Sequence, residues 1–157
     1  MIEQVAWKSP AFSWRRSKME KFDDFIKRVF DEQYEVCFGP DMLEKLEPRD
    51  YYLTRKEDDR LIALLHGQQV LENIHIKALV VAKAYQKKGL GASLLSELEE
   101  KAAEAGATSI TLSTKSYQAN DFYLKQGYEI YASLADVPQK GITKYHFIKR
   151  LGWACFK

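Results

Sequence analysis

The chain has 157 residues, of which 46% are hydrophobic and 29% charged, and its formal net charge at pH 7 is +2. These values are typical of a single globular domain, 1–157, and argue against disorder. Lys and Arg are mixed with Asp and Glu along the chain, which argues against a nucleic-acid-binding protein. Because no signal peptide, lipidation motif or eighteen-residue apolar run is present, we expect a cytoplasmic protein without membrane contact. Two cysteines without zinc-site spacing indicate no metal.

The N-terminal part of the chain is predicted to be mainly helical. Residues 1–9 can form a short edge strand. From Ser17 to about Phe38, apolar residues recur at helical spacing, and Gly39 ends this helix. A second, short helix is predicted over Met42–Glu47.

Three strands are predicted next, over Tyr51–Lys56, Leu61–Leu71 and Ile74–Ala82, each separated from the next by a polar turn. Gly67, inside the second of these strands, indicates a bulge. A helix with one apolar face then runs from Leu90 to about Gly106, and a half-buried strand follows over Thr108–Thr114. This order predicts a βαβ unit around the loop that joins the third strand to the helix.

That loop, Gln86–Gly91, has the features of a diphosphate-binding turn. A strand that turns directly into a helix leaves backbone N–H groups open at the positive end of the helix dipole. Gly89 and Gly91 let a ligand approach the main chain, and Lys87 and Lys88 add positive charge.

Two other phosphate-binding loops do not fit this segment. A nucleoside-triphosphate loop needs Gly-Lys-Ser/Thr, whereas Gly91 is followed by Ala92-Ser93. A Rossmann fingerprint needs a small residue where Leu94 stands. The pattern that fits is Q-x-x-G-x-G after an apolar strand.

A second motif lies at residues 116–128, read as SYQANDFYLKQGY. It predicts a short helix from about Gln118 to Gln126, followed by a strand over Tyr128–Leu134. A last strand is predicted over Thr143–Leu151. In the tail, 152–157, we expect Trp153 and Phe156 to pack on the domain.

With these two motifs in this order, the chain resembles the GNAT superfamily of N-acetyltransferases. The resemblance covers residues 51–151 well and the N-terminal helices only in outline. It implies an α/β (α+β) fold, the GNAT acyl-CoA N-acyltransferase fold, with a mixed, mostly antiparallel sheet and helices on both faces. It also implies that residues 17–47 form a helical region on the substrate side and that residues 74–127 bind acetyl-CoA.

The resemblance assigns roles to the two motifs. Backbone N–H groups of the third strand would stabilise the thioester oxyanion, and the loop would bind the pyrophosphate. Tyr123 matches the general-acid position, and we expect it to hydrogen-bond the leaving thiolate. Ser116 replaces an asparagine that binds the pantetheine arm, so it either reaches the cofactor or only caps the helix. The expected cofactor-binding residues are Leu79, Val80, Val81, Gln86, Lys87, Lys88, Gly89, Leu90, Gly91, Ala92, Ser93 and Ser116.

The base that receives the amine proton is the least determined part of the predicted site. His75 precedes Leu79 by four residues, where the histone-acetylating branch of the family has its catalytic glutamate. A histidine suits a base at neutral pH, although a lone strand histidine is more often structural. His66, Glu72 and His146 are weaker candidates, and a water chain is the alternative.

The sequence therefore predicts an acetyl-CoA-dependent N-acetyltransferase that works by direct transfer in a ternary complex. The acceptor would be a small-molecule or protein amine, and the protein a monomer or homodimer. Two alternatives stay open: a non-catalytic acyl-CoA-binding module, and a nucleotide-binding enzyme that uses the same loop. The acidic residues of the N-terminal helices are either solvated surface or part of a substrate-selecting region; they are Asp31, Glu32, Glu35 and Asp41.

Overall fold

The computed structural model describes residues 11–42 and 46–152, except for the side chains of 11–20 and 42. The predicted edge strand 1–9, most of the predicted helix Met42–Glu47, and Trp153 and Phe156 lie outside this description. The chain divides into two compact units, 1–46 and 47–157. A single domain over 1–157 stays a prediction.

The first unit contains the helix α1 (Ala11–Phe38) and the 3₁₀ helix η1 (Pro40–Met42). α1 begins six residues before the predicted Ser17 and ends at the predicted residue. Gly39 follows it with φ +85°, a left-handed conformation that glycine adopts without strain. The Gly39 N–H donates to the Glu35 carbonyl at 2.9 Å, which satisfies one of the last carbonyls of the helix.

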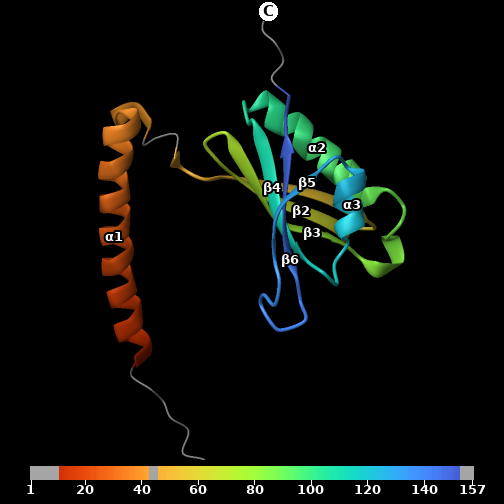
Figure 1. Ribbon diagram of the computed structural model, residues 1–157, viewed down its shortest axis with the longest axis horizontal. Helices are drawn as coiled ribbons and strands as arrows, with labels where there is room; N and C mark the ends of the chain where they lie inside the picture. Colours follow the sequence, from red (N-terminus) through yellow and green to blue (C-terminus); the bar gives the residue numbers. More distant parts are fainter. Residues whose placement is uncertain (1–10, 43–45, 153–157) are drawn as a thin grey trace, which may run out of the picture. The chain divides into compact units, whose positions relative to one another are not determined.

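The second unit is built around a six-stranded sheet with the order β1-β2-β3-β4-β6-β5 (Figure 1). Only the β3/β4 pair is parallel, and the other pairs are antiparallel, which confirms the predicted mixed, mostly antiparallel sheet. The strands are β1 (Arg49–Glu57), β2 (Arg60–Val70), β3 (Asn73–Val81), β4 (Ser109–Lys115), β5 (Glu129–Leu134) and β6 (Lys144–Arg150).

Helices α2 (Leu90–Glu104) and α3 (Asn120–Lys125) and the 3₁₀ helix η3 (Lys83–Tyr85) complete this unit. α2 is the crossover between the parallel strands β3 and β4, as the predicted βαβ unit requires. α3 is shorter than the predicted Gln118–Gln126.

The apolar face of α2 packs against the sheet. Its side chains Leu94, Leu95, Leu98 and Ala102 are buried in one cluster with residues of the strands. Burial of each such leucine contributes about 1.5–3 kcal/mol of transfer free energy. Tyr123 of α3 belongs to the same cluster. The presence of helices on the opposite face of the sheet stays a prediction.

Gly67 lies at a point of close packing and at the predicted bulge. The β2/β3 register shifts between His66 and Gly67, and the extra residue on β3 is Lys77. A Cβ at Gly67 would lie 3.1 Å from Cγ2 of Ile74 and 3.4 Å from Cδ1 of Leu98. The absence of a side chain at Gly67 therefore lets α2 approach β2 and β3 closely.

Candidate functional site

The parallel strands β3 and β4 pair over only part of their length. Their ladder joins Asn73–Ile76 to Ser109–Leu112. After the bulge at Lys77, β3 continues to Val81 in pairing with β2, while β4 continues through Ser113–Lys115 in pairing with β6. The two strands thus diverge, and the space between their ends is available for a ligand.

A cavity of about 700 Å³ occupies this divergence, a volume within the range of small-molecule sites. It is lined by residues 76–81 of β3, 85–87 and 89–92 of the loop and α2, and 112–114 of β4. Gln118, Ala119, Phe122 and Tyr123 complete the lining. The lining contains every predicted site residue except His75, Lys88, Ser93 and Ser116.

Backbone amides of β3 face this cavity. The Ala82 N–H donates to the Ile62 carbonyl of β2 at 2.8 Å. Because amides of an antiparallel strand alternate in direction, the Leu79 and Val81 N–H groups point away from β2, toward the divergence. The Val81 carbonyl supports this direction, since it accepts a hydrogen bond from Nε2 of Gln86 in the loop at 3.0 Å.

The loop presents further amides at the start of α2. Gly89 is the N-cap residue, with φ +81°, and no side chain caps the helix. The first three N–H groups of α2, those of Leu90, Gly91 and Ala92, have no acceptor within the helix. Lys87 also has a positive φ of 61°, and such alternating conformations turn successive N–H groups toward one point. This arrangement can bind a phosphate group.

Gly91 is predicted to leave room for a ligand, but its position also lies close to side chains of the protein. A Cβ at Gly91 would lie 3.2 Å from Cζ of Phe122 and 3.9 Å from Cγ2 of Val81. The small residue is therefore needed for the approach of α3 to α2, in addition to any approach of a ligand.

Tyr123 lies in the wall of the cavity and is only 8% exposed. Its ring contacts Phe122, Tyr128 and Phe147 at centroid distances of 5.1, 5.9 and 5.7 Å. Burial raises the pKa of its phenol above 10, so the hydroxyl is protonated at neutral pH and can donate a hydrogen bond.

His75 lies in the paired half of β3, outside the cavity lining. Its Nδ1 is 3.1 Å from Oγ1 of Thr111, and that hydroxyl donates to Oδ1 of Asn73 at 3.1 Å. Thr111 has one proton to donate, so Nδ1–H of His75 is the donor and the lone pair is on Nε2. Burial, assisted by the positive charge of Lys77, lowers the pKa of His75, so it is neutral at pH 7. Its role as base stays a prediction.

Three other predicted residues make contacts within the protein. Oγ of Ser116 accepts a hydrogen bond from the Thr143 N–H at 3.3 Å. Oγ of Ser93 accepts one from Nη2 of Arg55 at 2.9 Å. Nζ of Lys88 lies 5.1 Å from the centroid of the Tyr85 ring. Cofactor contacts by Ser116, Ser93 and Lys88 stay predictions.

The lining also includes residues that sequence reasoning missed. Ala119 and Phe122 stand inside the second motif, so the motif itself could have identified them. Leu112, Ser113 and Thr114 could not be found in this way, because their place depends on where the β3/β4 ladder ends.

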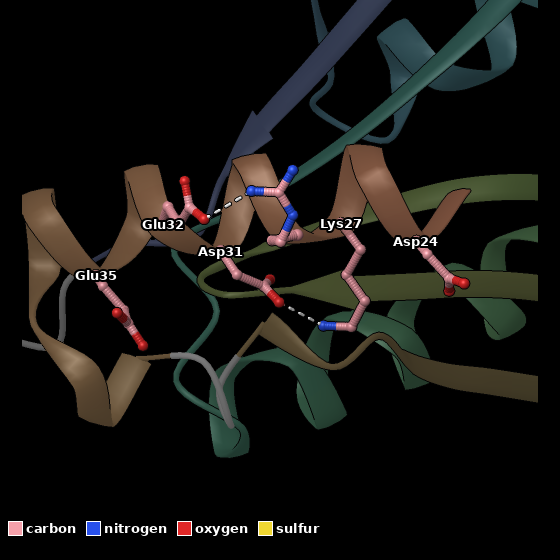
Figure 2. A pocket seen from close by; sticks show the side chains of 6 residues that line it. Asp24, Lys27, Asp31, Glu32 and Glu35 are labelled. Atoms are coloured by element: carbon pink, nitrogen blue, oxygen red, sulfur yellow. Dashed lines mark hydrogen bonds and ion pairs between the residues drawn. The ribbon is translucent and has the colours of Figure 1, made fainter. Parts of the chain in front are cut away.

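A second hollow, of about 320 Å³, lies on the surface of α1 alone (Figure 2). Its lining is charged throughout, and two ion pairs cross it at one-turn spacing. Lys27 Nζ lies 2.8 Å from Asp31 Oδ2, and Arg28 Nη1 lies 3.0 Å from Glu32 Oε1. Such exposed pairs are typical of a solvated helix surface, which favours that interpretation of the acidic residues.

Within 11–42 and 46–152, no group of three or more described His, Cys, Asp or Glu side chains can hold a metal ion. The helices in the same ranges include none with the length and apolar character that a membrane span requires.

Comparison with known proteins gives consistent matches. The family described as acetyltransferase (GNAT) matches residues 3–128. Blasticidin-S acetyltransferase of Streptomyces morookaense is 32% identical over 107 residues, which are 66% of this chain and 78% of that protein.

Solved structures agree with these sequence matches. A crystal structure of an acetyltransferase from Bacillus cereus has 32% identity and a TM-score of 0.71, and the match covers 82% of this chain and 91% of that one. An aminoglycoside 6′-N-acetyltransferase complexed with coenzyme A has 18% identity and a TM-score of 0.61, with coverage of 97% and 98%. At that identity the second likeness concerns the fold alone.

Proposed function

This chain belongs to the GNAT family of acetyltransferases, and we propose that it transfers an acetyl group from acetyl-CoA to a primary amine directly, within a ternary complex. One observation carries the proposal. The open amides of β3, the open amides at the start of α2 and the Tyr123 side chain all border the same cavity. These are the groups that a thioester with a diphosphate arm requires.

The first role of the site would be to hold acetyl-CoA. The N–H groups of Leu90, Gly91 and Ala92 would bind its pyrophosphate at the positive end of α2. Gln86 supports this geometry, because its bond to Val81 fixes the loop against the end of β3. The match to the GNAT acetyltransferase family supports the choice of ligand, and a protein of the same fold has been crystallised with coenzyme A.

The second role would be to stabilise charge during transfer. The amine nitrogen attacks the carbonyl carbon, the C–S bond breaks, and the sulfur leaves as thiolate. The Leu79 and Val81 N–H groups would hydrogen-bond the developing oxyanion, where loss of one donor costs about 3 kcal/mol. The Tyr123 hydroxyl would donate to the sulfur. Because burial raises its pKa above 10 and a thiol has a pKa of about 8.5, hydrogen bonding is favoured over full proton transfer.

The third requirement is a neutral amine. Deprotonation of a lysine-like amine at pH 7 costs about 4.6 kcal/mol. In this proposal the proton leaves to water in the cavity. His75 has a free Nε2 lone pair but lies outside the lining, so it would act only through such a water.

We propose a small molecule as the acceptor, with blasticidin S as the first candidate, because the relative of that name shares 32% identity with this chain. The test is release of free thiol from acetyl-CoA in the presence of blasticidin S, spermidine, an amino acid and a peptide with a free N-terminus. We expect release that depends on the acceptor and is fastest with a small molecule. Fastest release with the peptide would contradict the acceptor class.

A second candidate function is an acyl-CoA-binding module without turnover. The contact between Ser116 and Thr143 favours it, since Oγ of Ser116, which is expected on the pantetheine arm, accepts a hydrogen bond within the protein. Thermal stabilisation by acetyl-CoA without thiol release from any acceptor would support this module. Stabilisation by ATP or NAD in place of CoA would indicate a nucleotide-binding enzyme. A cytoplasmic location and a monomeric or homodimeric state stay predictions.

A further inference from the structure

Lys149 of β6 connects three elements beside Tyr123. Its Nζ donates to Oε2 of Glu99 on α2 at 2.7 Å and to the Gln126 carbonyl at the end of α3 at 2.8 Å. The two charged side chains are 26% and 22% exposed. Because the pair is partly shielded and one of its groups also holds a backbone carbonyl, it constrains geometry more than an exposed pair does.

α3 needs contacts of this kind to keep its position. It has six residues, too few for a stable helix in isolation, and no side chain caps its N-terminus at Ala119. Its first residue is held from outside, since Asn120 accepts a hydrogen bond from Thr114 and donates one to the Lys115 carbonyl at 3.3 Å. Lys149 holds the other end, where a positive charge also complements the helix dipole.

The same pair reaches Tyr123 by a second route, through Tyr128. The Tyr128 N–H donates to the Tyr123 carbonyl at 3.0 Å, and the two rings meet edge to face at 5.9 Å. Nζ of Lys149 lies 5.5 Å from the centroid of the Tyr128 ring, and the Tyr128 hydroxyl is 3.4 Å from Oε1 of Glu99. Glu99 and Lys149 together thus contact two structural neighbours of Tyr123, the C-terminal end of its helix and the ring of Tyr128.

We propose that Lys149 and Glu99 are positioning residues for acetyl transfer, which hold α3 so that the Tyr123 hydroxyl faces the leaving sulfur. This inference rests on the proposed function of Tyr123. Lys149 and Glu99 lie outside the cavity lining and are not assigned any contact with acetyl-CoA. Their effect should therefore appear in turnover and not in cofactor affinity.

The test is a double-mutant cycle between Lys149→Met and Tyr123→Phe. Alone, Lys149→Met should lower kcat by about 10-fold, because a displacement of ~1 Å can cost up to about 10²-fold, while the acetyl-CoA Kd stays within about twofold. In the Tyr123→Phe background, which lacks the hydroxyl, Lys149→Met should cause little further loss. Lys149→Arg, which keeps the charge and the donors, should restore most of the turnover.

Lys101→Met is the matched control. Lys101 also pairs with a glutamate of α2, Glu97, but at 3.9 Å and in a more exposed position, so its removal should leave kcat unchanged. If Lys149→Met does not fold, as judged by near-UV circular dichroism, Glu99→Gln replaces it in the same cycle.

The outcomes separate this inference from the proposed function. If Lys149→Met lowers kcat equally with and without the Tyr123 hydroxyl, Lys149 is structural and the positioning role is overturned, while the function stands. If Tyr123→Phe alone retains wild-type turnover, the acid role of Tyr123 fails and the positioning role fails with it.

Discussion

The two halves of β3 belong to one strand but have different surroundings. Asn73–Ile76 pairs with β2 on one side and β4 on the other, and its Ile74 and Ile76 are buried. After the bulged Lys77, Ala78–Val81 pairs with β2 only, and its Val80 is 56% exposed. The first half therefore has its backbone groups satisfied within the sheet, whereas the second leaves alternate amides open to the cavity.

This difference indicates where function can reside on a strand. A backbone N–H that is already bonded in a ladder cannot stabilise a substrate oxyanion, so the scaffold must stop pairing where the chemistry begins. The bulge at Lys77 marks that point, since bulges disrupt the ladder and redirect a strand. We therefore propose that Asn73–Ile76 has a structural role and that Ala78–Val81 and the groups across the cavity take part in the reaction.

Tyr123 lines the same cavity as the open half of β3, the residues after the bulge, and its variant should show the largest effect. Tyr123→Phe keeps the ring and its aromatic contacts, so the fold and the acetyl-CoA Kd should barely change. Turnover should fall by ~10²-fold or more, the scale of a lost acid, because the hydroxyl acts on charge that develops in the transition state. Single-turnover kinetics with an acceptor that the wild-type enzyme uses will measure the chemical step. Wild-type turnover would mean that the open half works without Tyr123.

The strands, α2 and the glycine-containing turn before α2 could be predicted because each depends on local signals. Apolar alternation located the strands, and Gly89 and Gly91 marked the turn that opens α2. The extent of the β3/β4 ladder could not be predicted in this way. It depends on the pairing of segments 36 positions apart, as between Asn73 and Ser109, and sequence periodicity does not report where two paired strands separate.

Two side-chain contacts of the site have the same tertiary origin. Oγ of Ser116 accepts a hydrogen bond from the N–H of Thr143, 27 residues later, which the motif around Ser116 does not report. The nearest non-local neighbour of Gly91 is Phe122, which the pattern of the turn does not report either. In both cases the deciding contact is tertiary.

A variant of Gly91 tests the other group of open amides, those at the start of α2. Gly91→Val should lower acetyl-CoA affinity by ~10-fold or more, because overpacking of this kind costs about 1–3 kcal/mol and the added atoms lie beside the open amides. Isothermal titration calorimetry with acetyl-CoA measures the effect. Unchanged affinity would exclude this turn as the pyrophosphate site.

The cause of that loss can be identified with the smaller Gly91→Ala variant. Its Cβ would lie 3.2 Å from the Phe122 ring. In a Phe122→Leu background the collision is relieved, and affinity should recover if packing is the cause. Persistent loss relative to Phe122→Leu alone would instead show that the Cβ obstructs the ligand.

His75 lies in the paired half of β3, Asn73–Ile76, so we expect a variant of His75 to have the smallest effect on turnover. His75→Gln should keep kcat/KM within about threefold, the scale of a change of ~0.5 kcal/mol. A catalytic base would instead cost ~10²-fold or more and its removal would abolish the acidic limb of the pH profile. That result would mean that the paired half of β3 takes part in the reaction, and it would contradict the proposed division of the strand.

The stability of the same variant should depend less on pH than that of the wild type. Burial lowers the pKa of His75 in the folded state below 6.5, so between the two pKa values the unfolded chain binds more protons. The stabilisation linked to neutral His75 is therefore complete above pH 6.5 and is lost as the pH falls through the lowered pKa. Glutamine does not titrate, so urea midpoints at pH 7.5 and 5.5 should differ less in His75→Gln than in wild type. An equal difference would mean that His75 is protonated as easily in the folded chain as in the unfolded one, contrary to its burial against Thr111.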